Sequence, residues 1–361
     1  MDPRAQVAHV GAGLLRRPYR PSWVDRLQSD LERLPWAPWV SYLGAWVVLA
    51  TIETLSKWSV GSYPVGTVFP FHLVAFGTAA YGLALLHFLD RSAVRALESS
   101  RPLLSLDAAA YDDLRWRLVT MPAVPVALAT LFGMAFGAFQ RHALVGPHIA
   151  SYRFAVDGPL AVYEFVVVPL ITWGVIAVFT YGTLRQARLI DAIYRDRLAI
   201  DLFSVRPLYA FAAHAARMSI GLLAIGYLWV ATYPRDLSQA IMGLFTGTLL
   251  LLTALAAALF FSSLWGAHQR LEADRQRRTA EALQRLGAVL AHQRQLLDSG
   301  AFAACDATAK AIAGLNAELE YLGKASTWPW PVTMLRTFVT VLLVPLVVFV
   351  AQRVVQLRFG L

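Results

Sequence analysis

The sequence predicts an all-α, polytopic membrane protein with about seven transmembrane helices and a cytosolic helical hairpin layer. The first observation is composition: of 361 residues, 57% are hydrophobic and only 15% are charged, whereas about a quarter of the residues in soluble domains are charged. The second is that apolar segments of about 20 residues, the length of a bilayer-crossing helix, recur along the chain. A soluble core cannot hide so many of them, so the composition excludes an ordinary soluble domain.

Seven apolar segments have the length expected of transmembrane helices. They are residues 36–58, 66–89, 121–139, 158–184, 207–233, 237–266 and 335–355. The third is the shortest and begins with Pro122 and Pro125. The sequence therefore does not decide whether this segment crosses the whole membrane. These segments predict four regions. They are an N-terminal segment 1–35, a six-helix region 36–266, a helical hairpin with a Trp-Pro joint 267–334, and a final helix 335–361.

The distribution of basic residues predicts the orientation. Of the 32 arginines and lysines, 24 fall in four segments that one side of the membrane would hold. These segments are 1–35, 90–118, 185–206 and 268–334. Because basic residues concentrate on the cytoplasmic side, we expect a cytoplasmic N-terminus and an external C-terminus. We expect the protein in the plasma (inner) membrane of a bacterium, with the lipid bilayer as a partner and no nucleic acid.

Polar segments next to the spans are expected to be helical. Residues 22–34 space apolar side chains as in an amphipathic helix on the inner leaflet, with a plain linker as the alternative. Residues 92–100 and 107–118 predict two short helices, the second capped by Ser105 or Asp107. The sixth span has no Gly-Pro break after it, so we expect its helix to continue through residues 269–297.

Two heptad patterns predict an antiparallel hairpin over residues 268–324, with a turn at Gly300. The apolar positions alternate steps of three and four residues. We expect these side chains to mediate assembly: Leu283, Leu286, Leu290, Leu297, Ile312, Leu315, Leu319 and Leu322. The partner that packs against them is either another inner loop or a second subunit.

Charged residues within the spans form a candidate outer pocket. An ionisable group in hydrocarbon is costly unless it is paired or hydrated, and therefore marks a possible functional site. The candidates are Glu53, Lys57, His72 and Glu164. Three of them lie at similar predicted depths below the outer surface. The alternative is local: Glu53 pairs with Lys57 at i,i+4, and the other two bind neighbouring helices.

A proline-rich segment separates the hairpin from the last span. Its residues Trp328, Pro329, Trp330 and Pro331 prevent a continuous helix. The segment is either a rigid elbow or a lever that transmits hairpin movement. The last span is a candidate hydrophobic gate or pore lining, although it could equally face lipid. The candidate pore residues are Val341, Val344, Pro345, Val348 and Gln352.

No catalytic, cofactor-binding or metal-binding residues are predicted, and we do not expect an enzyme. The sequence has no Gly-rich phosphate loop, no His-Glu-x-x-His and no Gly-x-Ser-x-Gly motif. The single cysteine, Cys305, excludes a cysteine-based metal cluster and an intramolecular disulfide.

At the level of topology, residues 237–355 resemble the insect gustatory and odorant receptor channels. The resemblance lies in the long sixth helix, a second cytosolic helix at 302–323 and the terminal span. It implies seven spans, an internal N-terminus and a pore-lining last helix. The family's terminal Thr-Tyr to Gln-Phe pattern is not matched, because Thr340 and Gln352 stand too far apart and lack the Tyr and Phe.

These observations favour a homo-oligomeric channel or ligand-sensing membrane protein. The second hypothesis is a non-conducting sensor or scaffold that binds a cytosolic protein partner through residues 268–324. The third is a secondary transporter, which the lack of an internal repeat disfavours.

Overall fold

The protein is all-α in the part of the chain that the computed structural model describes. This part comprises residues 18–61, 63–68, 70–140, 142, 167–198, 202, 208–232 and 239–359. Some side chains within these ranges are outside the description, among them those of His72, Pro345, Val348 and Gln352. Ten α-helices and two short 3₁₀ turns make up the described chain.

Seven of the helices overlap the predicted apolar segments, and α3, α7 and α9 extend at least ten residues beyond them. Five of them (α2, α3, α7, α8 and α9) are long and apolar enough to cross a membrane, and α5 and α11 contain shorter apolar stretches. The number of crossings, seven, therefore stays a prediction. Their bounds are Pro38–Ser59 (α2), Pro70–Ser99 (α3), Ala123–Phe139 (α5), Val168–Asp196 (α7), Tyr209–Ala231 (α8), Gln239–Asp298 (α9) and Val332–Phe359 (α11).

The remaining helices are α1 (Trp23–Glu32), α4 (Ala108–Val119) and α10 (Cys305–Lys324), with 3₁₀ turns at Arg101–Leu103 and Phe302–Ala304. Ser22 begins α1 with a reciprocal capping box to Asp25. Asp107, one of the two predicted caps, begins α4 by accepting a hydrogen bond from the Ala110 amide. The predicted separate helix at 92–100 was wrong. These residues continue α3 to Ser99, because nothing in Asp90–Ser99 breaks the helix.

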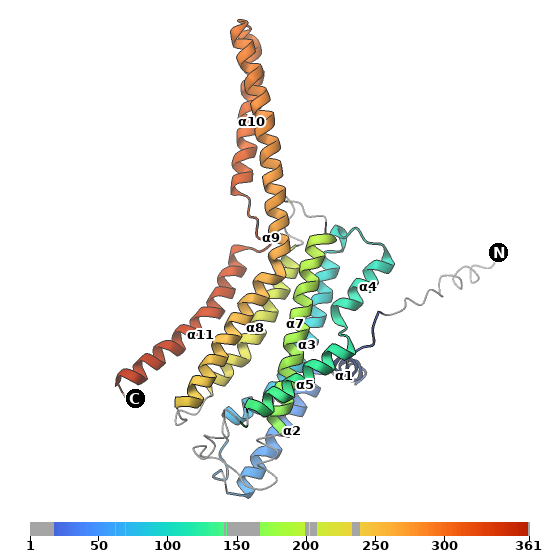
Figure 1. Ribbon diagram of the computed structural model, residues 1–361, viewed down its shortest axis with the longest axis vertical. Helices are drawn as coiled ribbons and strands as arrows, with labels where there is room; N and C mark the ends of the chain where they lie inside the picture. Colours follow the sequence, from blue (N-terminus) through green and yellow to red (C-terminus); the bar gives the residue numbers. More distant parts are fainter. Residues whose placement is uncertain are drawn as a thin grey trace, which may run out of the picture.

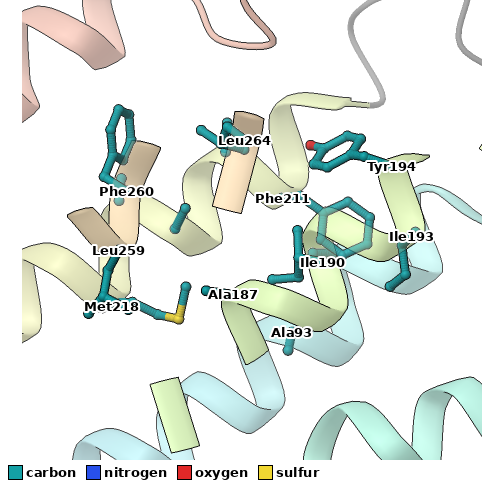
Figure 2. Packing of buried hydrophobic residues seen from close by; sticks show 14 of the residues in the cluster. Ala93, Ala187, Ile190, Ile193, Tyr194, Phe211, Met218, Leu259, Phe260 and Leu264 are labelled. Carbon is teal, nitrogen blue, oxygen red and sulfur yellow. The ribbon is translucent and has the colours of Figure 1, made fainter. Parts of the chain in front are cut away.

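The centre of the bundle lies where α3, α7, α8 and α9 meet. Figure 2 shows apolar side chains from all four helices directed toward one another, including Ala187, Phe211, Met218 and Phe260. Tyr194 is fully buried there, and its hydroxyl donates to the carbonyl of Leu208. Burial of this apolar surface against neighbouring helices fixes the positions of the four long helices.

Glycines bring α5 and α7 together. A Cβ atom at Gly133 would collide with the backbone carbonyl oxygen of Trp173, and one at Gly137 would lie 3.0 Å from the carbonyl oxygen of Pro169. Glycines four residues apart permit such close helix packing in membranes. The Gly-x-x-x-Gly spacing at 133–137 is the sequence signal of this contact.

The hairpin (residues 268–324) stands out beyond the other helices at one end of the molecule (Figure 1). As predicted, α9 is one continuous helix of 60 residues, about 90 Å long at 1.5 Å per residue. It ends two residues before Gly300, which adopts a left-handed conformation with φ 71°. The chain then turns back and α10 packs along α9.

Two other features of Figure 1 bear on function. The C-terminal ends of α3 and α7 and the short helix α4 lie toward the end of the molecule that carries the hairpin. Helix α11 lies at the edge of the bundle, packs mainly on α8 and leads away from the hairpin.

Candidate functional site

The predicted outer pocket is only partly within the described residues. Glu53 and Lys57 on α2 are buried, with 2% and 0% of their side chains exposed, and their charged groups lie 3.5 Å apart. The Lys57 ammonium also lies 5.1 Å from the centre of the Tyr63 ring. This is the local i,i+4 pair that the spacing allows. Glu164 and the side chain of His72 lie outside the described residues, so the pocket stays a prediction.

A polar cluster around α1, which the sequence analysis missed, lies near the hairpin-side half of α3 and α7. Helix α1 packs against α2 and α5, and Val24 and Gln28 are buried there. The Trp23 indole donates to the Thr130 hydroxyl at 3.0 Å. The sequence predicts a helix on the lipid surface or a linker for this segment. In the structure, α1 has a protein-facing side, because its polar residues find partners on α3, on α5 and on the backbone of Met121.

Asp25 fastens the start of α1. Its carboxylate accepts hydrogen bonds from the Ser22 amide at 2.7 Å and from the Met121 amide at 3.1 Å. Burial raises the pKa of Asp25, and the hydrogen bonds from Ser22 and Met121 oppose that rise. The backbone is tied as well, since the Ser22 amide also donates to the carbonyl of Met121.

Glu32 fastens the other end of α1 to α3. Its Oε1 lies 3.0 Å from His87 Nε2 and 2.9 Å from Arg91 Nη2. The hydroxyl of Tyr42 on α2 lies 3.2 Å from the other ring nitrogen of His87. The tautomer with a proton on Nε2 satisfies both contacts, so Tyr42, His87 and Glu32 form a chain of hydrogen bonds from α2 to α1.

Between these two anchors lies a group of polar side chains from three helices. The Gln186 amide on α7 donates to the Asp90 carboxyl on α3 at 2.6 Å. The amide of Gln28 on α1 faces the same carboxyl. Arg185 donates to the Tyr19 hydroxyl at 2.5 Å. The sequence around Asp90 does not predict that Asp90 contacts Gln186 and Gln28. This contact depends on how α1 packs against the other helices.

The Trp-Pro joint packs against α9. Helix α10 ends at Lys324 and α11 begins at Val332, so the prolines do separate two helices. Trp328 and Trp330 stack with ring centres 4.3 Å apart. Phe260 of α9 stacks on Phe338 of α11 at 4.1 Å. Whether the joint is an elbow or a lever stays a prediction.

The candidate pore residues are on the outlying helix α11. Val341 is partly buried against the core cluster, whereas Val344 is exposed. The side chains of Pro345, Val348 and Gln352 lie outside the described residues. The Tyr227 hydroxyl of α8 donates to the carbonyl of Leu342 at 2.8 Å. This bond falls three residues before Pro345, where the proline interrupts the backbone hydrogen bonds of the helix.

The predicted assembly residues divide into two sets. The first set faces the partner helix of the hairpin and is buried or partly buried: Leu286, Ile312, Leu315, Leu319 and Leu322. The second set lies on α9 and is exposed: Leu283 at 53%, Leu290 at 36% and Leu297 at 47%. These three leucines are spaced seven residues apart, so they form one stripe along the outer side of α9.

The described elements define an all-α chain with five candidate membrane-spanning helices and a protruding hairpin. The chain matches no protein-family model, no curated protein and no solved structure. Among the described residues, no group of three or more His, Cys, Asp and Glu side chains is placed to hold a metal ion.

Proposed function

We propose that the chain is the subunit of a homo-oligomeric membrane protein that assembles through its hairpin. The observation that carries this proposal is the exposed leucine stripe: Leu283, Leu290 and Leu297 on the outer side of α9. A two-helix hairpin buries a single apolar seam, and helices depend on such packing for most of their stability. Two hairpins that pair along the stripe make a four-helix bundle, which buries the leucines.

Charge on the two arms favours a second copy as the partner. Residues 277–298 of α9 carry four arginines against two acidic residues, whereas α10 carries three acidic residues against two lysines. The α9 arm of one copy and the α10 arm of another therefore attract each other. On α10 the exposed small residues Ala307, Ala311 and Gly314 leave room for close helix approach.

Within such an assembly we propose that α11 lines a conducting path. Helix α11 is at the edge of the subunit, and the exposed residues Thr333, Thr337 and Thr340 recur on one side of its first half. Farther along, Val344 and Val347 continue that side with apolar groups. A polar entrance followed by an apolar constriction is the arrangement of a pore that gates by dewetting. The resemblance of residues 237–355 to the insect chemoreceptor channels, which rests on the predicted topology, favours it by analogy alone.

The test of assembly is native mass spectrometry of the purified protein in nanodiscs. We expect a discrete oligomer for the wild type and a monomer for the triple variant Leu283→Gln, Leu290→Gln and Leu297→Gln. The matched control changes three other exposed positions of the same helix, Gln284→Ala, Ala291→Gln and Gln295→Ala, and keeps the oligomer. Circular dichroism of all three proteins checks that the helices persist. A monomeric wild type would overturn the proposal.

Conduction is tested separately, in planar bilayers with the oligomer. We expect single-channel currents that change when Val344→Thr makes the constriction more polar. An oligomer without currents would overturn the channel and leave the non-conducting sensor or scaffold, with the hairpin as its protein-binding element.

A further inference from the structure

Three polar side chains meet inside the helix bundle beside α1. Gln28 of α1 is 8% exposed and Gln186 of α7 is 4% exposed. Asp90 of α3 lies between them with its Oδ2 atom buried. A hydrogen bond from Gln186 Nε2 to Asp90 Oδ1 at 2.6 Å joins two members of this group, and the Gln28 amide faces the same carboxyl.

Three buried polar atoms of the group have no hydrogen-bond partner among the described residues. They are Asp90 Oδ2, Gln186 Oε1 and Gln28 Nε2. Leaving such an atom unpaired costs the full desolvation penalty of the group, so native proteins seldom do it. Two of the three are oxygen acceptors, one on each of the two groups that the Nε2–Oδ1 bond joins. An ionised Asp90 supplies no donor to either of them.

We propose that Asp90 binds a proton and shares it with Gln186. A proton on Oδ2 converts the carboxylate into a donor, and the new O–H donates to Gln186 Oε1. The acid and the amide then form a two-bond cyclic pair, in which one proton satisfies both orphaned acceptors. The hydroxyl oxygen keeps lone pairs that can accept from Gln28 Nε2, so α1 joins the same network.

The charges around Asp90 favour the neutral acid. Asp90 is buried, and Asp25 of α1 is a second carboxyl that faces it, so burial and like charge both disfavour an ionised Asp90. Arg185 of α7 is the nearby cation, but it donates to the Tyr19 hydroxyl, and no ion pair between it and Asp90 is found in the described part of the chain. The other polar or charged groups near Asp90 are Tyr42 of α2, His87 and Arg91 of α3, and Arg217 of α8, which binds Ser92.

The proton on Asp90 therefore connects α1, α3 and α7 through one hydrogen-bond network. When it is lost, Gln186 Oε1 and the ionised Asp90 carboxylate face each other without a donor between them, and the like charges of Asp90 and Asp25 weaken the hold on α1. Proton binding at Asp90 therefore controls the docking of α1. This inference does not depend on the assembly or the channel.

Infrared spectroscopy tests the proton directly, because a protonated carboxyl has a C=O stretching band that a carboxylate lacks. At pH about 7, where exposed Asp and Glu are ionised, we expect the wild type to show this band. Asp90→Asn should remove it. Gln186→Leu should keep the band but shift it, since the hydrogen bond to Oε1 is gone. The control Asp113→Asn, which removes a partly exposed carboxylate on α4, should leave the protonated-carboxyl band unchanged.

Unfolding experiments provide the second readout. Asp90→Asn places an N–H donor where the O–H stood, so we expect it to keep the unfolding midpoint of the wild type. Asp90→Ala should remove the hydrogen-bonded pair with Gln186 and lower the unfolding midpoint. A wild-type spectrum with no band that Asp90→Asn removes would overturn the proposal and assign the orphaned atoms to a bridging water and an ionised Asp90. An Asp90→Asn variant as unstable as Asp90→Ala would overturn it as well.

Discussion

The imidazole ring of His268 on α9 lies flat against the indole of Trp328 in the Trp-Pro joint. The ring centres are 3.9 Å apart and the planes differ by 5°. The ring nitrogen Nδ1 of His268 also lies 3.1 Å from the carbonyl oxygen of Thr327. The start of the joint is therefore attached to α9 at the level where the hairpin leaves the bundle.

This attachment predicts that Trp328→Ala destabilises the connection between the hairpin and α11. Truncating a packed aromatic side chain removes both apolar burial and ring stacking, so we expect a loss of about 2 kcal/mol or more. Unfolding in mixed micelles with rising SDS measures it. Trp39→Ala, which truncates an exposed tryptophan of α2, is the control. Equal effects of the two changes would show that the stack contributes nothing.

The close contact between α5 and α7 predicts different responses at two glycines of the same interface. Gly133→Ala places a methyl group against the backbone of Trp173, which cannot yield as a side chain can. Gly174→Ala meets Met134 and Thr130 at 3.4 Å or more, which is ordinary van der Waals contact. We expect Gly133→Ala to destabilise the protein by about 1–3 kcal/mol, the cost of overpacking, and Gly174→Ala to change little. SDS-titration unfolding of both variants checks this, and a tolerated Gly133→Ala would contradict the packing.

The sequence predicted the positions of the helices better than it predicted the contacts between them. Apolar length located the helices that could cross a membrane, and the absence of Gly-Pro breaks predicted the continuous α9. These features are local, so periodicity and composition report them. The heptads predicted the hairpin, but they could not show which leucines face α10. The pattern repeats every seven residues on both sides of the seam, and only packing distinguishes Leu286 from Leu290.

The cluster beside α1 could not be predicted for a different reason. Asp90 and Gln186 are 96 residues apart, and each stands at the end of an apolar stretch, where polar residues are common. Their contact with Gln28 follows from the docking of α1, which depends on the backbone bond from Ser22 to Met121. No spacing rule links positions that far apart.

The bond from Tyr227 to the carbonyl of Leu342 predicts that Tyr227→Phe loosens α11. The change removes one hydroxyl and keeps the ring, so we expect a loss of about 1 kcal/mol. Hydrogen exchange should rise around Pro345, where the helix lacks a backbone bond. Tyr81→Phe removes an equivalent bond between α3 and the carbonyl of Gly221 and should leave exchange in α11 unchanged. Unaltered exchange in Tyr227→Phe would show that this bond does not hold α11.

The Glu32 anchor predicts an acid-sensitive docking of α1. Burial alone would raise the pKa of Glu32, but its hydrogen bonds with His87 and Arg91, together with their charges, outweigh burial and lower the pKa below 4.5. A carboxyl whose pKa is lower in the folded state stabilises the fold when ionised. That stabilisation is complete above about pH 4.5 and is lost as the pH falls through the folded-state value.

Glu32→Gln keeps the shape of the side chain and removes its charge. We therefore expect the variant to unfold at a lower temperature than the wild type near neutral pH, because the charge-assisted bonds to α3 are weakened. The difference should shrink as the pH falls below about 4.5, since the wild type then loses its own charge at residue 32. Thermal unfolding in detergent over this pH range measures it. Asp30→Asn, which removes an exposed carboxylate from the same helix, should show a small difference that varies little with pH. A difference between wild type and Glu32→Gln that stays constant with pH would mean that the carboxylate charge does not hold α1.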